Sequence, residues 1–169
     1  MMHEKILIDF SDPNEKDRWE TINDTVMGGI SESRAFTTPE NTAIFQGYVS
    51  LENSGGFASI RTVPRKFDLK GYAGIMIRVK GDGKHYRLRL RTEDDFDGVA
   101  YQATFPTSFQ EWSEVRLPFS EYRPVFRGHI VSDAPKLDQA RVRRIGFMIA
   151  DKQEGSFVLE IAWVKAYAL

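Results

Sequence analysis

Short runs of alternating apolar and polar residues fill most of this chain and constrain its fold more than any other feature. Such alternation is typical of β-strands, because successive side chains of a strand point to opposite faces of a sheet. Clusters of Gly, Pro, Asn and Asp separate the runs and indicate turns between them. The pattern predicts strands over residues 5–10, 30–36, 43–51, 57–63, 72–80, 84–92, 99–105, 113–117, 142–150 and 156–167.

Helical patterning is scarce by comparison. Residues 12–20 and 134–140 are predicted to form short helical turns, since a polar residue and a proline introduce each segment. Many short strands at regular spacing favour a sandwich or a barrel. We therefore expect an all-β sandwich of two antiparallel sheets, with residues 1–169 in one domain. An open-ended lipocalin-like barrel is the alternative, which Pro118 and Pro124 make less attractive.

The composition excludes several classes of function. Lys and Arg number 23 against 24 Asp and Glu, a net charge of −1, so nucleic-acid binding is not expected. The absence of cysteine excludes disulfides, thiolate zinc sites and cysteine nucleophiles. No window approaches the ~18 apolar residues of a membrane helix, and the first residues do not resemble a targeting peptide. We expect a cytoplasmic protein that does not span a membrane, although a partner could hold it at the inner membrane.

One predicted strand carries a row of cations. In residues 84–92, alternation places His85, Arg87, Arg89 and Arg91 on one face of the sheet. Guanidinium groups gathered in this way either pair with nearby acids or bind carboxylates, phosphates or sugars in a groove. Both interpretations stay open at this point.

Neighbouring strands are predicted to extend this arginine-bearing face. Gly81-Asp-Gly83 is a good hairpin signal, and such a hairpin would bring Arg78 beside the row. Arg61 on the strand 57–63 would join it. Tyr101 and Gln102 on the following strand would add an aromatic ring and an amide, which suit both peptides and sugars.

Two glycine pairs, each beside a polar residue, indicate special backbone conformations near Asp24 and Asn53. In one interpretation, Asp24 caps a turn that Gly28 and Gly29 tighten. In the other, these loops form the rim of a pocket and flank one end of the groove. The residues that would then meet a ligand are Asp24, Met27, Gly28, Gly29, Asn53, Gly55 and Gly56.

The last predicted strand, 156–167, carries apolar residues on both faces and a single carboxylate, Glu160. A carboxylate buried between layers needs a partner. A salt bridge or an edge position is one interpretation. The other is a structural calcium ion shared with Asp9 and backbone carbonyls, because calcium prefers carboxylate and carbonyl oxygens. We expect no cofactor beyond this ion.

Catalytic patterns are missing from the sequence. It contains no HExxH zinc motif, no Gly-x-Ser-x-Gly nucleophile elbow and no Walker A loop. The acids of 93–97 could in principle serve a glycosidase, but acids before a glycine are typical of a solvated turn. We therefore expect a binding domain and not an enzyme.

Several motifs also match a known family when they are read together. They are Trp19, the run Asn23-Asp-Thr-Val-Met-Gly-Gly-Ile-Ser31 and the run Leu51-Glu-Asn-Ser-Gly-Gly-Phe-Ala-Ser-Ile-Arg61, followed by Gly81-Asp-Gly83, Tyr101-Gln102 and Arg127-Gly128. In these motifs the chain resembles the complex I intermediate-associated protein 30 family.

The resemblance extends from about Phe10 to Ala168 and implies a galactose-binding-like jelly roll. It also implies a non-enzymatic, chaperone-like role in the assembly of respiratory complex I (NADH:ubiquinone oxidoreductase) through contacts with a subunit or an assembly intermediate. A lectin-like module that binds a glycan or another small ligand is the alternative. The candidate binding residues are Asp24, Met27, Gly28, Gly29, Asn53, Gly55, Gly56, Arg61, Arg78, Arg89, Arg91, Tyr101, Gln102 and Arg127.

Overall fold

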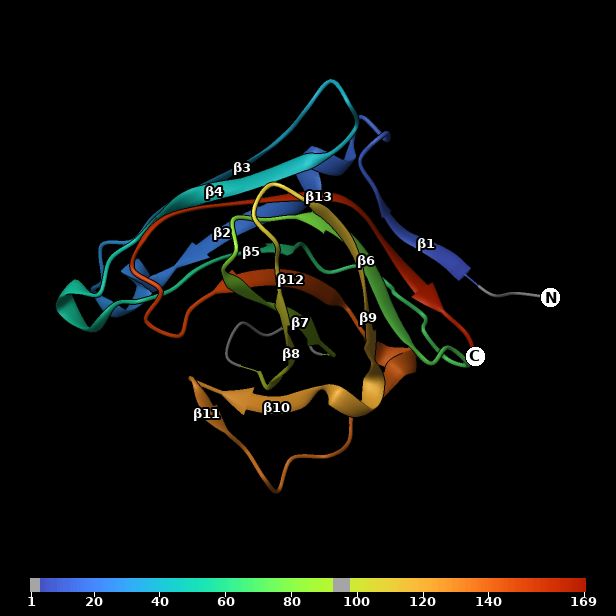
Figure 1. The fold of residues 1–169 in the computed structure, drawn as a ribbon. Helices are drawn as coiled ribbons and strands as arrows, with labels where there is room; N and C mark the ends of the chain where they lie inside the picture. Colours follow the sequence, from blue (N-terminus) through green and yellow to red (C-terminus); the bar gives the residue numbers. More distant parts are fainter. Residues whose placement is uncertain (1–3, 93–97) are drawn as a thin grey trace.

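Two antiparallel sheets pack face to face in the computed structural model of the protein, which describes residues 4–92 and 98–169 apart from the side chains of residues 26, 27 and 54 (Figure 1). The six-stranded sheet has the order β3 (Glu32–Thr37), β4 (Ala43–Val49), β13 (Gly155–Tyr167), β6 (Gly74–Lys80) and β9 (Trp112–Pro118), and β1 (Glu4–Asp9) also pairs with β13. The seven-stranded sheet has the order β11 (His129–Ile130), β10 (Arg123–Phe126), β8 (Ala100–Pro106), β7 (His85–Arg91), β12 (Arg144–Ile149), β5 (Ala58–Thr62) and β2 (Trp19–Asn23).

Helical structure in the described ranges is limited to single 3₁₀ turns. They are η1 (Glu15–Arg18), η2 (Asp24–Met27), η3 (Glu52–Ser54), η4 (Phe119–Glu121) and η5 (Gln139–Arg141). Within these same ranges, none of the helical segments has the length and apolar character that crossing a membrane requires.

The all-β sandwich predicted from the alternation is confirmed, and each predicted strand is present within two residues at either end. The sequence pattern missed β2, β10 and β11. In β2 none of the side chains is fully buried, so alternation is weak there, and the predicted turn over 12–20 ends earlier, at Arg18. The second predicted turn, 134–140, is reduced to η5.

The predicted hairpin at Gly81-Asp-Gly83 is wrong. β6 lies in the six-stranded sheet between β13 and β9, whereas β7 lies in the seven-stranded sheet between β12 and β8. The chain therefore crosses from one sheet to the other at these glycines. Gly81 fits because a Cβ there would lie 2.2 Å from the Cβ of Thr107. Turn chemistry predicts a reversal of the chain, but it does not say whether the next strand stays in the same sheet.

The core lies between the two sheets and is rich in aromatic rings, among them Tyr86, Phe105 and Phe147, which are fully buried. A bulge in β13 between Ile161 and Trp163 changes which residues face this core. Consequently Val164 is buried and Trp163 turns outward, with the Nζ of Lys165 4.1 Å from its ring centroid. The prediction that β13 is buried on both faces is also wrong, because Val158 is 40% exposed.

Candidate functional site

A groove of about 720 Å³ lies on the face of the seven-stranded sheet that points away from the core. Its floor is formed by β7, β12 and β5, and β10 with the turn at Arg127 and Gly128 contributes one side. The loops 55–57 and 150–152 border one end. We call this the arginine groove, after Arg61, Arg87, Arg89, Arg91 and Arg144, which line it.

Strand register brings residues of β7, β12 and β5, and of the adjoining β8, together in the middle of the floor. Gln102 on β8 lies opposite Arg89 on β7, and Arg89 lies opposite Gly146 on β12. Gly146 in turn lies opposite Arg61 on β5. A Cβ at position 146 would lie 2.7 Å from the carbonyl oxygen of Ile60, so only glycine fits there without a shift. The floor is therefore open between two arginines.

Glu20 and Asp151 hold three of the arginines. Glu20 Oε1 lies 2.8 Å from Arg61 Nε and 2.7 Å from Arg144 Nη1. Arg87 forms an ion pair with Asp151 at the end of the groove. Burial raises the pKa of Glu20, but the hydrogen bonds and charges of Arg61 and Arg144 outweigh it and leave that pKa below its usual value.

Arg91 also forms a hydrogen bond, whereas Arg89 forms none with the described residues. Arg91 Nη1 donates to the carbonyl oxygen of Gly98 at 2.7 Å. Within the described ranges Arg89 forms no hydrogen bond or ion pair, and its Nε is buried. The side-chain oxygen of Gln102, opposite Arg89, is likewise buried without a donor.

Charge in the groove is strongly one-sided. Of the described residues that line it, seven are Lys or Arg and one, Asp151, is acidic. Burial first, and then the charges of Arg91, Arg87 and Arg61, lower the pKa of Arg89 to about 9. The near-neutral chain thus concentrates positive charge at one place, and an anion there would relieve the repulsion between the guanidinium groups.

The glycine pairs serve a different purpose, because they enclose Asp24. This side chain is 0% exposed, and its Oδ1 accepts from the backbone N–H of Ser31 at 2.9 Å. Its Oδ2 accepts from the Ser31 hydroxyl, from Gly56 N at 2.7 Å and from Phe57 N at 3.3 Å. Burial raises the pKa of Asp24, but these hydrogen bonds together outweigh it and hold that pKa below its usual value.

The interpretation of Asp24 as a structural residue is therefore the one the geometry supports. Carbon atoms added at Gly29 or Gly55 would lie 2.5 Å from atoms of its carboxylate, which explains why both positions are glycine. Of the described residues in these two loops, those that line the groove belong to the second loop and include Gly55 and Gly56. Gly28 is exposed on the first loop.

Other predicted site residues have mixed outcomes. Arg127 lines the groove with its guanidinium over the ring of Phe126, at 5.3 Å from the centroid. Asn53 is exposed in a left-handed conformation with φ 56°. The side chain of Met27 and the acids of 93–97 lie outside the described residues.

Arg78 and Tyr101 were wrongly placed on the arginine-bearing face. Arg78 belongs to the other sheet, where its Nη1 lies 3.7 Å from Glu114 Oε1, because β6 and β7 are not a hairpin. Tyr101 points into the core, and its hydroxyl donates to the carbonyl oxygen of Pro135 at 2.7 Å. Adjacent strand residues face opposite sides, so Tyr101 and Gln102 could not both line the groove.

The candidate list missed Arg87, Arg144 and Asp151. Alternation alone identifies Arg87, because it shares a face with Arg89 and Arg91. The signal for Arg144 is its even spacing from Gly146 and Met148 on β12, which also line the groove. Asp151 follows a strand end, and no local pattern predicts its ion pair with Arg87.

Glu160 and Asp9, the predicted calcium ligands, have separate partners. Glu160 Oε1 lies 3.4 Å from Lys80 Nζ, and its Oε2 accepts from the Thr42 hydroxyl at 2.7 Å. Asp9 Oδ1 accepts from Ser11. The salt-bridge interpretation of Glu160 is confirmed. The residues described around the pair do not fit calcium, because a lysine already faces Glu160 and nowhere in the described ranges do three or more His, Asp or Glu gather.

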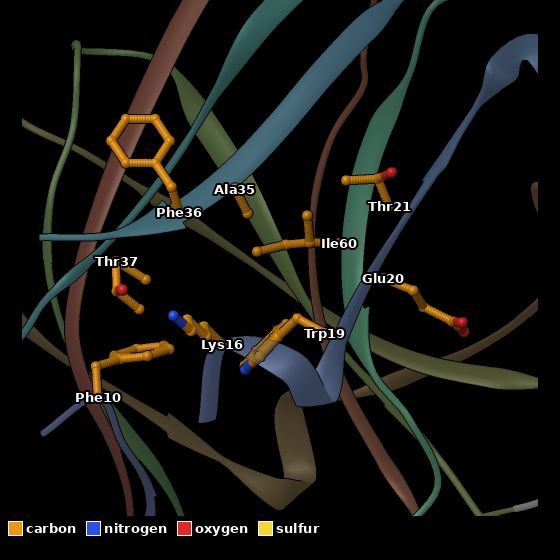
Figure 2. A pocket seen from close by; sticks show the side chains of 10 residues that line it. Phe10, Lys16, Trp19, Glu20, Thr21, Ala35, Phe36, Thr37 and Ile60 are labelled. Carbon is orange, nitrogen blue, oxygen red and sulfur yellow. The ribbon is translucent and has the colours of Figure 1, made fainter. Parts of the chain in front are cut away.

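A second, smaller cavity of about 400 Å³ is lined by residues of the edge strands β2 and β3 and of η1 (Figure 2). Phe10 and Trp19 lie side by side there, with ring centroids 6.1 Å apart, and Lys16 lies next to them. Glu20 points away from Lys16 in Figure 2, and its carboxylate pairs with Arg61 and Arg144 of the arginine groove. Strand β2 therefore contributes to both cavities.

Comparisons with known structures support the sandwich fold. A family 11 carbohydrate-binding module of a cellulosomal cellulase from Clostridium thermocellum superimposes with a TM-score of 0.75 at 17% identity, covering 100% of this chain and 96% of that one. A structure of such a module from the same organism, in complex with a β-1,3-1,4-mixed-linked tetrasaccharide, gives a TM-score of 0.74 at 18% identity, with 99% and 97% coverage. Both are jelly-roll sandwiches, and this chain shares their fold.

Sequence comparisons identify the family. Mouse (Mus musculus) Complex I intermediate-associated protein 30, mitochondrial, is 26% identical over 99% of this chain, and its Drosophila melanogaster counterpart is 26% identical over 94%. The chain spans 57% of the mouse protein and 61% of the fly protein. The sequence model of the family named Complex I intermediate-associated protein 30 matches residues 8–161. The chain therefore belongs to the complex I intermediate-associated protein 30 family.

Proposed function

We propose that this protein is a binding domain that assists the assembly of respiratory complex I by holding part of a subunit or of an assembly intermediate in the arginine groove. The family membership supports the link to complex I. The observation that carries the binding role is the groove itself, a cavity of about 720 Å³ whose described lining residues include seven cations and one acid. Such a groove is large enough for a peptide segment.

A role in binding, and not in catalysis, agrees with how the polar groups of the groove are used. Glu20 and Asp151, the acids that the structure places at the described arginines, are both held in ion pairs. Neither is poised beside a nucleophile or a histidine as a general base would be. The guanidinium groups offer recognition of an anion and bring no reactive group of their own.

Glycan binding is the second candidate function. The arginines and the Gln102 amide can donate hydrogen bonds to hydroxyl groups, and the solved carbohydrate-binding modules share the fold. Against it, the described groove residues include no Trp or Tyr, and the aromatic rings on its walls are Phe57 and Phe126. Trp and Tyr combine a large ring with a polar group and suit sugars, so a groove without them suits an anionic partner better than a neutral sugar.

The assembly role is tested by deleting the gene in a host that has complex I. We expect less assembled complex on native gels and lower NADH:ubiquinone oxidoreductase activity, both restored by the wild-type gene. The double variant Arg89→Glu/Lys152→Glu should fail to restore them. A matched control, Arg34→Glu/Arg78→Glu, makes the same charge change on the six-stranded sheet and should restore both.

Two results would contradict this proposal at different levels. Normal complex I in the deletion strain would remove the assembly role. A deletion defect that the groove variant repairs as well as the wild type would keep the assembly role and remove the groove as its surface. Immunoblots must show equal amounts of each variant, so that a failure to fold is not mistaken for loss of binding.

A further inference from the structure

Four buried side-chain polar atoms of residues that line the arginine groove have no hydrogen-bond partner in the described structure: the Nε atoms of Arg87, Arg89 and Arg144, and the side-chain oxygen of Gln102. Asp151 and Glu20 hold Arg87 and Arg144 through other nitrogens of their guanidinium groups, whereas Arg89 and Gln102 lie directly opposite each other across β7 and β8. Native proteins pair nearly all buried polar atoms, since an unpaired one loses its hydrogen bonds to water without replacement. A donor and an acceptor without partners on opposite residues of a cavity floor indicate a place where a ligand completes the hydrogen bonding.

Among the arginines on the groove floor, Arg89 is the one for which the described residues provide no hydrogen bond or ion pair. Arg61 and Arg144 share Glu20, Arg87 pairs with Asp151, and Arg91 donates to Gly98. These contacts fix the outer guanidinium groups around a central one. Their charges act on Arg89 without neutralising it, so the site favours a negatively charged group over a neutral one.

The unpaired atoms of Arg89 and Gln102 also specify which hydrogen-bonding groups the ligand must carry. The guanidinium of Arg89 is a planar set of donors that matches a carboxylate bidentately. The oxygen of Gln102 accepts, so a donor must lie close to the anion. An acidic residue in a polypeptide supplies both, because its side chain ends in a carboxylate and its own backbone carries an N–H. A fully ionised phosphate supplies acceptors only.

The apolar side chains on the walls of the groove also suit a polypeptide. Apolar side chains of Phe57, Val125, Phe126 and Met148 line it beside the charged floor. Gly55, Gly56 and Gly128 at its borders expose backbone without side chains. A segment in which acidic residues alternate with apolar ones would place its carboxylates on the floor and its apolar side chains against the walls.

We propose that the floor of the arginine groove, at Arg89 and Gln102, binds the side-chain carboxylate of an acidic, partly apolar polypeptide segment. The inference rests on the proposed function and names the partner chemistry that the assembly role would use. It assigns the specific recognition to Arg89, while Arg61, Arg87, Arg91 and Arg144 hold the groove in shape and contribute positive charge around it.

The test is fluorescence anisotropy with a labelled nine-residue peptide in which Glu alternates with Val and Leu, beside the same peptide with Gln in place of Glu. Wild-type protein should bind the Glu peptide at least tenfold more tightly than the Gln peptide. Arg89→Met should reduce the affinity for the Glu peptide by about tenfold or more, and Gln102→Leu by a smaller factor. Arg78→Met, on the other sheet, is the matched control and should bind as wild type does.

Arg89→Lys separates loss of charge from loss of the planar fork. It keeps the charge and a similar volume, so it should fold like the wild type and recover part of the affinity lost in Arg89→Met. Thermal unfolding of each variant checks that the protein is intact. If Arg89→Met does not fold, the comparison of Arg89→Lys with the wild type decides, and equal affinity for the Glu peptide would then overturn the proposal.

Four results would overturn the carboxylate site. They are no binding of the Glu peptide by the wild type, equal affinity for the Glu and Gln peptides, unchanged affinity in a folded Arg89→Met variant, and Arg89-dependent binding of inorganic phosphate or glucuronate where the peptide does not bind. The deletion strain reports on assembly alone and the peptide titration on the groove alone, so the failure of one is distinguishable from the failure of the other.

Discussion

Asp24 and Arg89 are both charged side chains withdrawn from solvent, and the protein surrounds them in opposite ways. The carboxylate of Asp24 accepts hydrogen bonds from Ser31, Gly56 and Phe57, and two glycines leave just enough room for it. The guanidinium of Arg89 has a buried Nε without a partner and three arginines nearby. The contrast agrees with a structural role for Asp24 and with the ligand-binding role that we propose for Arg89.

The largest expected effect on stability comes from removing the carboxylate of Asp24. Asp24→Ala would leave the N–H groups of Ser31, Gly56 and Phe57 unpaired, so we expect a loss of about 3 kcal/mol or more in the free energy of unfolding. Urea denaturation measures it. Asp151→Asn, which removes the exposed charge that pairs with Arg87 and keeps a residue suited to the φ of 62° there, is the control and should cost less than about 1 kcal/mol. Equal losses of unfolding free energy in the two variants would show that the buried Asp24 carboxylate stabilises the fold no more than an exposed acid does.

Glycine substitutions around Asp24 should follow, with a somewhat smaller effect. Gly55→Ala forces a Cβ to within 2.5 Å of the Asp24 carboxylate, and we expect a loss of about 2 kcal/mol. Gly28→Ala meets open space and should cost only the roughly 1 kcal/mol of a left-handed alanine. The order of the two midpoints in urea checks this, and a reversed order would show that the packing around Asp24 is not what selects glycine.

Acid should weaken the Asp24 site. The folded protein holds the pKa of Asp24 below its usual value, so the stability that the ionised carboxylate contributes is present above that usual pKa and is lost as the pH falls through the folded pKa. Unfolding in urea between roughly pH 2 and 6 should show the wild type and Asp24→Asn converging at the acid end. A constant difference over this range would mean that the carboxylate charge does not stabilise the fold. The lowered pKa values of Asp9 and Glu20 act on both proteins equally.

The smallest effect on stability is expected at Arg89. Its charge is disfavoured by burial and by Arg91, Arg87 and Arg61, so Arg89→Met should leave the free energy of unfolding unchanged or raise it by up to about 1 kcal/mol. Thermal and urea unfolding measure the change. A loss comparable with that of Asp24→Ala would show that Arg89 holds the fold together, and the proposed ligand site would then lose its main support.

The sequence allowed much of this contrast to be predicted. Period-two alternation identified the strands and placed Arg89 and Arg91 on one face, because both follow from local geometry. The glycine pairs pointed to close backbone approaches, although not to the side chain they enclose. That side chain is Asp24, and its partners Ser31 and Gly56 lie 7 and 32 residues away along the chain.

The remaining features depend on which strands become neighbours. The misplaced Arg78 shows this, since the turn before β7 joins two sheets and not two paired strands. The bulge in β13 is another case, because it exchanges the positions of Trp163 and Val164 relative to the core without any signal in the alternation. Arg144 joined the groove through the pairing of β12 with β7.

The position of β13 has a consequence for how the protein acquires its structure. This strand is the last one along the chain, yet it lies between β4 and β6 and also pairs with β1, whose Glu4 lies opposite Tyr167 (Figure 1). During synthesis, the six-stranded sheet therefore lacks its centre until the final strand has left the ribosome. Until then β4 and β6 expose open edges that other chains could pair with, so a newly made chain passes through an aggregation-prone stage before its own sheet closes.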